Sequence, residues 1–93
     1  MIVSNSTPLI YLAKIKRLHL LKDLFGKVLI PLEVKREVVD EGKRRREADA
    51  YLIEQEINAG WLQVEKVHTL LKFEIEIDAG EKAAISLAQE KKQ

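Results

Sequence analysis

The sequence predicts one α/β domain, with a short parallel sheet of about three strands flanked by helices in three α/β/α layers. The composition is globular, because 46% of the 93 residues are hydrophobic and 33% are charged. Short apolar runs also alternate with longer segments in which apolar residues recur every three or four positions. Such alternation implies parallel strands joined by right-handed crossovers. The length fits a single domain, which we assign to residues 1–93.

Three runs have strand character, because each is short and either rich in β-branched residues or alternating in polarity. They are residues 2–4, 28–30 and 61–64. Pro31 closes the second run and suits the first turn of the helix that follows. Residues 69–77 fit either a strand or a helix, and both assignments stay open.

Helices are predicted where apolar residues recur at helical spacing. They cover about residues 9–15, 18–25, 31–39, 47–59 and 78–88. Gly26 and Gly60 follow two of these segments, at the position where helices commonly end. Residues 40–46 are the most polar stretch, and we expect a loop there.

Several classes of protein are disfavoured by composition. Cysteine is absent, which excludes disulfides and thiolate metal sites. No apolar run approaches the roughly 20 residues that span a bilayer, and the start lacks the basic stretch of a signal peptide. We therefore expect a cytoplasmic protein without a membrane partner. The net charge of +1 gives no overall bias toward nucleic acid.

Polar residues follow the predicted strands, where ligands bind in open parallel sheets. They are Ser4, Asn5, Ser6 and Thr7 after the first strand, Glu33 and Glu37 after the second, and Asp78 and Glu81 at the start of the last helix. Oxygen ligands of this kind suit Mg²⁺, and two such ions can activate water for attack on a phosphodiester. The alternative is helix capping, which the spacing alone favours, because acids and hydroxyl residues are common at helix starts.

Four segments together resemble PIN domains, and in particular the prokaryotic branch related to VapC-type toxins. They are the opening I-V-S-N-S-T-P-L-I, residues 24–38, residues 59–64 and residues 77–88. The resemblance covers nearly the whole chain and implies a PIN-like fold. It also implies a Mg²⁺- or Mn²⁺-dependent endoribonuclease of toxin–antitoxin type.

The resemblance implies roles for particular residues. Asn5 falls at the family's first Asp, while Glu37 and Glu81 fall at its second and third acids and would be catalytic. Asp78 is a further metal-ligand candidate, and Ser6 and Thr7 match supporting hydroxyl positions. Because Asn5 carries no charge, and because the family continues into a further strand with another Asp beyond Gln93, we expect a degenerate acidic site.

The missing strand would leave residues 2–4 at an open sheet edge, which is an association hazard. We expect a second copy of the chain to cover it, giving a homodimer. Two alternatives to a nuclease stay open: a non-catalytic remnant that dimerises or binds an antitoxin-like protein, and a folding fragment with no independent role.

One basic cluster is present, Lys43-Arg44-Arg45-Arg46. It could contact RNA phosphates in a salt-sensitive way. The interpretation that we favour is a solvated loop, because the acids Asp40, Glu41, Glu47 and Asp49 flank it. Trp61 is expected in the core or at an interface rather than stacked on a base.

Overall fold

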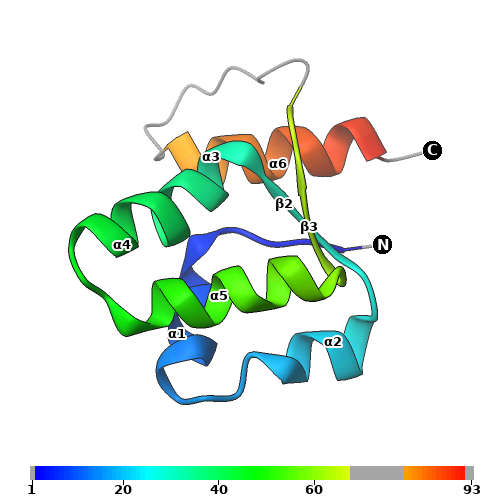
Figure 1. The fold of residues 1–93 in the computed structure, drawn as a ribbon. Coiled ribbons are helices and arrows are strands. Elements are labelled where there is room, and N and C mark those ends of the chain that lie inside the picture. Colours follow the sequence, from blue (N-terminus) through cyan, green and yellow to red (C-terminus); the bar gives the residue numbers. More distant parts are fainter. Residues whose placement is uncertain (1, 68–78, 92–93) are drawn as a thin grey trace.

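A computed structural model describes residues 2–67 and 79–91 of the chain, and it contains the predicted parallel sheet (Figure 1). The strands are β1 (Ile2–Val3), β2 (Val28–Pro31) and β3 (Leu62–Glu65), in the order β1-β2-β3. Both pairs are parallel, with Val28 opposite Ile2 on one side and Leu62 on the other. The central position of β2 explains why all four of its residues are buried.

The helices follow the predicted order closely. They are α1 (Ser6–Lys14), α2 (His19–Phe25), α3 (Leu32–Lys35), the π-helical η1 (Arg36–Glu41), α4 (Gly42–Arg44), α5 (Ala48–Ala59) and α6 (Ala79–Lys91). Gly26 and Gly60 end α2 and α5 with φ of +69° and +100°, conformations that favour glycine. The ambiguous residues 69–77 lie outside the described residues. No helix in the described part is long and apolar enough to cross a membrane.

Helices cover both faces of the sheet, so the domain has the predicted three layers (Figure 1). Side chains alternate along β2: Val28 and Ile30 belong to the main core, to which α1, α2, α3, η1 and α5 contribute. Leu29 points to the opposite face, where α6 packs on β1 and β2 with Leu87 fully buried. The α/β fold class and the sheet are thus confirmed.

The loop predicted over residues 40–46 was wrong, because η1 and α4 carry the helical backbone through Arg44. A close approach between helices explains the difference: a Cβ atom at Gly42 would lie 2.8 Å from the Cβ of Ala50 in α5. Gly42 has a helical φ of −59°, so its role is to admit α5 and not to break the helix. The chain leaves the helical conformation at Arg46, whose φ is +60°.

Candidate functional site

The carboxyl edge of the sheet brings together the starts of three helices. Strand β1 turns into α1 at Asn5, and β2 turns into α3 at Pro31. Helix α3 packs against α6, and Figure 1 shows the start of α6 beside α3. Ligands of parallel sheets bind at this edge. The topology therefore collects the polar residues that follow β1 and β2 where a site is expected.

Two side-chain oxygens near these strand ends are buried without a hydrogen-bond partner among the described residues. They are Oγ of Ser6 and Oε1 of Glu33. Leaving a buried polar atom unpaired costs about 1–3 kcal/mol. Such atoms suit a partner supplied from outside the chain, such as water or a cation that prefers oxygen ligands.

The capping interpretation of Ser6 and Thr7 was wrong, because both residues lie inside α1 and not before it. Asn5 occupies the N-cap position with an extended backbone, and its side chain makes no capping hydrogen bond. Ser6 is 8% exposed, whereas Thr7 faces solvent. Ser6 is thus a buried hydroxyl at the end of β1 without a capping role.

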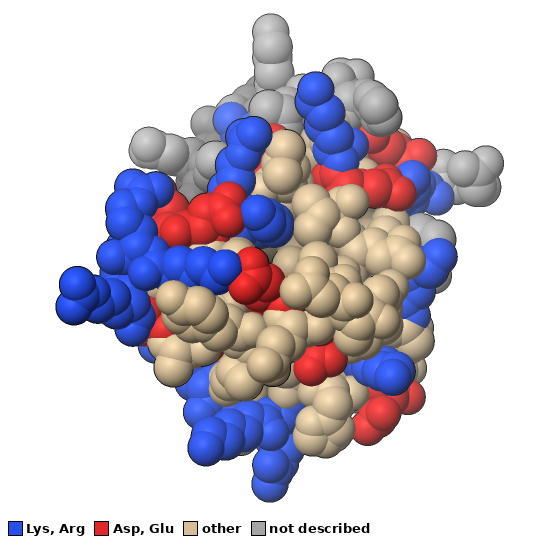
Figure 2. Space-filling view, in the orientation of Figure 1, with Lys and Arg blue, Asp and Glu red and all other residues tan. Residues whose placement is uncertain are grey.

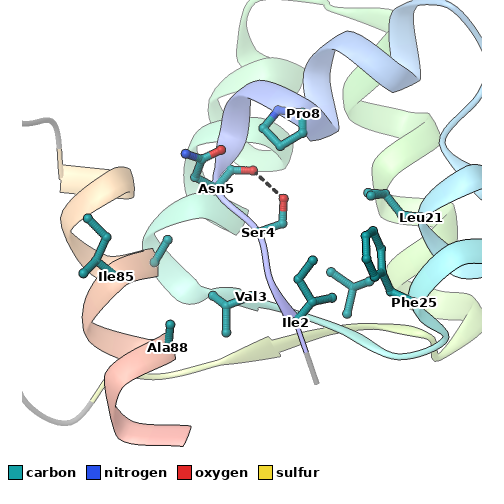
Figure 3. A pocket seen from close by; sticks show the side chains of 11 residues that line it. Ile2, Val3, Ser4, Asn5, Pro8, Leu21, Phe25, Ile85 and Ala88 are labelled. Atoms are coloured by element: carbon teal, nitrogen blue, oxygen red, sulfur yellow. Dashed lines mark hydrogen bonds between the residues drawn. The ribbon is translucent and has the colours of Figure 1, made fainter. Parts of the chain in front are cut away.

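Asn5 lines an apolar groove of about 490 Å³ beside β1 (Figure 3). Ser4 donates a hydrogen bond from its Oγ to the backbone carbonyl of Asn5 at 3.0 Å. The lining side chains are uncharged throughout: Ile2, Val3, Ser4, Asn5, Pro8, Leu21, Phe25, Val28, Ala84, Ile85 and Ala88. This groove by itself supplies no carboxylate.

Glu37 is exposed on η1 and lines a different, smaller cavity of about 180 Å³. Two more acids, Glu47 and Asp49, and the cations Lys14 and Arg45 share that cavity. Asp49 is 9% exposed although it is charged. From the sequence, Asp49 was expected only as an ion-pair partner of the basic cluster. Asp49 lies four residues before the fully buried Ile53. Residues four apart share one face of a helix, so this spacing could have placed Asp49 on the inner face of α5.

The described residues do not by themselves form a metal site. No group of three His, Cys, Asp or Glu side chains within residues 2–67 and 79–91 is arranged to hold a metal ion. Glu81 lies in the first turn of α6, but its side chain and all of Asp78 are outside what the structure describes. Near the strand ends, the described side chains whose oxygens could bind a cation are those of Asn5, Ser6 and Glu33.

The basic cluster is interleaved with acids (Figure 2). Lys43 contacts Glu54 at 2.6 Å and lies 5.3 Å from the centre of the Tyr51 ring. The hydrogen bond with Glu54 raises the pKa of Lys43 above its usual value. Arg45 pairs with Glu41 at 3.7 Å. Glu54 was not among the acids expected to pair with the cluster, because it lies farther along α5 than the acids that flank the cluster in sequence.

Trp61 has a structural role in the core, as predicted. It is 8% exposed and belongs to the main core cluster. Its Nε1–H donates a hydrogen bond to Oε1 of Glu56 at 2.7 Å. This partner satisfies the indole group, so neither its face nor its N–H is presented to a base.

Together, the parallel sheet, the helices on both of its faces and the polar strand ends define an α/β domain with polar residues at the carboxyl edge of its sheet. The chain matches the family model DUF3368, described as a PIN domain, over residues 1–93. It therefore belongs to this PIN domain family. No curated protein and no solved structure matches the chain in the comparisons.

Proposed function

We propose that this chain is a metal-dependent ribonuclease relative of toxin–antitoxin type with a degenerate acidic site. The observation that carries the proposal is the pair of buried, unpartnered oxygens on Ser6 and Glu33 near the ends of β1 and β2. Membership of a PIN domain family supports the class of function but not a location for the site. A ligand that prefers oxygen donors would relieve the cost of burying both atoms.

In this proposal Asn5, Glu37 and Glu81 hold a Mg²⁺ or Mn²⁺ ion, with Asp78 as a neighbouring ligand. Such an ion would lower the pKa of a water molecule, so that hydroxide could form and attack a phosphodiester. Asn5 offers a neutral amide oxygen where a carboxylate would add a full charge, so it binds the cation more weakly. Ser6 and Thr7 support the ligands at the start of α1, with the Ser6 hydroxyl already buried there.

A non-catalytic role is the second candidate, and a specific observation favours it. Asn5 and Glu37 line different cavities, and the groove that holds Asn5 is apolar and uncharged. A surface of this kind binds protein more readily than a phosphate backbone. In this second candidate the chain binds an antitoxin-like protein or a second copy of itself and cleaves nothing.

The deciding experiment is Mn²⁺-dependent cleavage of a labelled single-stranded RNA by the wild type. A Glu37→Gln, Glu81→Gln double variant is the control, because each change removes a charge and keeps the side-chain size. Cleavage by the wild type that disappears in this variant is expected for a ribonuclease. An Asn5→Asp variant should cleave faster, since it restores a carboxylate at the strand end.

Equal cleavage by the wild type and the double variant would reject the ribonuclease and leave the binding role. Circular dichroism of each variant should match the wild type, because Asn5 and Glu37 are not in the core. A metal-free chelated sample separates this activity from contaminating nucleases that need no metal.

A further inference from the structure

A separate cavity of about 210 Å³ lies between α5 and the turn that joins α1 to α2, the region at the bottom of Figure 1. Its lining residues all belong to the described part of the chain: Ala13, Lys16, Leu18, His19, Leu52 and Glu56. None of them lines the groove of Asn5 or the cavity of Glu37. The cavity is therefore distinct from the polar residues at the carboxyl edge of the sheet.

The floor of this cavity is apolar and its rim is ionisable. Ala13 and Leu18 are only 1% and 5% exposed. Lys16 and His19 are exposed, and Glu56 is half-buried. A mostly apolar lining with a few polar groups is usual in sites for small molecules. The volume is below the roughly 300–1,000 Å³ of sites for drug-sized ligands, so a ligand here would be small.

The ionisable groups at the rim are free to meet a ligand. No ion pair joins Lys16, His19 or Glu56 to another described residue. One oxygen of Glu56, Oε1, accepts the hydrogen bond from Trp61 Nε1–H at 2.7 Å. This bond orients the carboxylate and leaves its charge without a cationic partner. The rim thus offers one negative charge, one positive charge and an imidazole N–H donor.

Lys16 stands in a backbone conformation that favours glycine, with a φ of +58°. It follows α1 in a Schellman motif: its N–H donates to the carbonyl of Ala13, and the N–H of Arg17 donates to that of Leu12. Glycine would adopt this conformation without strain, so the lysine lowers stability here. A solvated crevice between helices does not explain a strained cation at its rim, whereas a ligand site does.

We propose that this cavity binds a small α-amino acid with an apolar side chain. The ammonium group pairs with Glu56, and the carboxylate pairs with Lys16 and accepts the His19 N–H. The side chain lies on the apolar floor. A simple anion would meet the Glu56 carboxylate and a simple amine would meet Lys16, so a molecule that carries both charges fits the rim best. This site goes beyond the proposed nuclease and does not depend on it.

The test uses L-leucine as the probe and follows the indole N–H of Trp61 in nitrogen–proton correlation NMR spectra. Trp61 is the only tryptophan of the chain, so it gives a single indole signal, and its hydrogen bond to Glu56 makes that signal report on the cavity. We expect a saturable shift with a Kd on the order of 1 mM, which suits so small a ligand.

Three analogues test which parts of the probe are recognised. Isocaproate lacks the ammonium group and isoamylamine lacks the carboxylate, so each should bind roughly fivefold more weakly than L-leucine. Glycine lacks the apolar side chain and should bind more weakly by roughly tenfold or more.

Lys16→Gly separates binding from folding. It should raise the Tm by several degrees because it relieves the strain, yet it should weaken L-leucine binding roughly fivefold because it removes the cation. Arg46→Gly is the matched control: Arg46 has a φ of +60° and ends α4 in the same motif. It also loses one positive charge and its strain, but Arg46 does not line the cavity, so the Kd should stay within about twofold of wild type.

Glu56→Gln tests the other end of the ligand. It keeps an oxygen for the Trp61 N–H and removes the charge, so it should weaken binding roughly fivefold while the free protein stays folded. The absence of a saturable shift with L-leucine would overturn the proposal. The same Kd in Lys16→Gly and Arg46→Gly would also overturn it, as would isocaproate that binds as tightly as L-leucine.

Discussion

At the residue scale, the buried hydroxyl of Ser6 shows how a local rule can misassign a residue. Hydroxyl residues are common at helix starts, which suggested a cap, yet the helix begins one residue earlier than a Ser6 cap would require. Its oxygen is instead buried with no partner in the described structure. A buried, unpaired oxygen lowers the stability of the free protein, and a bound ligand that contacts this oxygen can offset the cost. Functional sites commonly lower stability in this way.

Replacing Ser6 with Ala should therefore stabilise the metal-free protein by about 0.5–1 kcal/mol, because the unpaired hydroxyl is removed. The same variant should show a smaller rise in Tm on addition of Mn²⁺ than the wild type does. Ser86→Ala is the control: Ser86 is 1% exposed and has an interaction partner, so its loss should destabilise the protein. Urea unfolding with and without Mn²⁺ measures both effects. Destabilisation by Ser6→Ala would show that its hydroxyl is satisfied in solution.

At the element scale, the three strands and the longer helices could be predicted from the sequence. Their signals are spacings of apolar residues over a few neighbouring positions. Residues 28–30 form one continuous apolar run, as expected for a strand buried on both faces. The helix over residues 42–44 was missed because its cause is distant in sequence: Gly42 packs against Ala50. Glu33 lies on a helix that packs against the last helix, so the burial of its Oε1 atom could not be deduced, although its position after a strand was noted.

Gly42→Ala tests this explanation of the helix. Alanine favours a helix by about 1 kcal/mol over glycine, but the new methyl would stand 2.8 Å from the Cβ of Ala50. Neither atom can rotate away, so the variant should lose about 1–3 kcal/mol of stability. Adding Ala50→Gly should recover part of the loss, and a double-mutant cycle in urea measures that coupling. Asn58→Ala, at an exposed position in α5, should change stability by less than about 0.5 kcal/mol. Additive effects of the two substitutions would contradict a direct contact.

At the scale of the whole molecule, the net charge is only +1, and several cations of the described part pair with acids. Lys43 and Arg45 pair with acids, while Arg44 and Arg46 are exposed at the end of α4. Interleaved charges of both signs weaken the field that a phosphate backbone would meet. Among the described residues, the apolar groove has no charged lining residue, and the cavity of Glu37 is lined by three acids and two cations.

The salt dependence of RNA binding shows whether the basic cluster nonetheless contacts phosphates. A variant with Arg44→Ser, Arg45→Ser and Arg46→Ser is compared with a control carrying Lys16→Ser, Arg17→Ser and Lys22→Ser, three exposed cations elsewhere. Both variants lose three positive charges, so any effect of the overall charge on RNA affinity is the same in both.

We expect the two variants to show the same slope of log K against log salt concentration, measured by fluorescence anisotropy with a labelled single-stranded RNA. A slope shallower by about 2 in the first variant alone would mean three lost phosphate contacts, because each contributes about 0.7 on single-stranded RNA. That result would place the RNA path over α4, next to the cavity that Arg45 shares with Glu37.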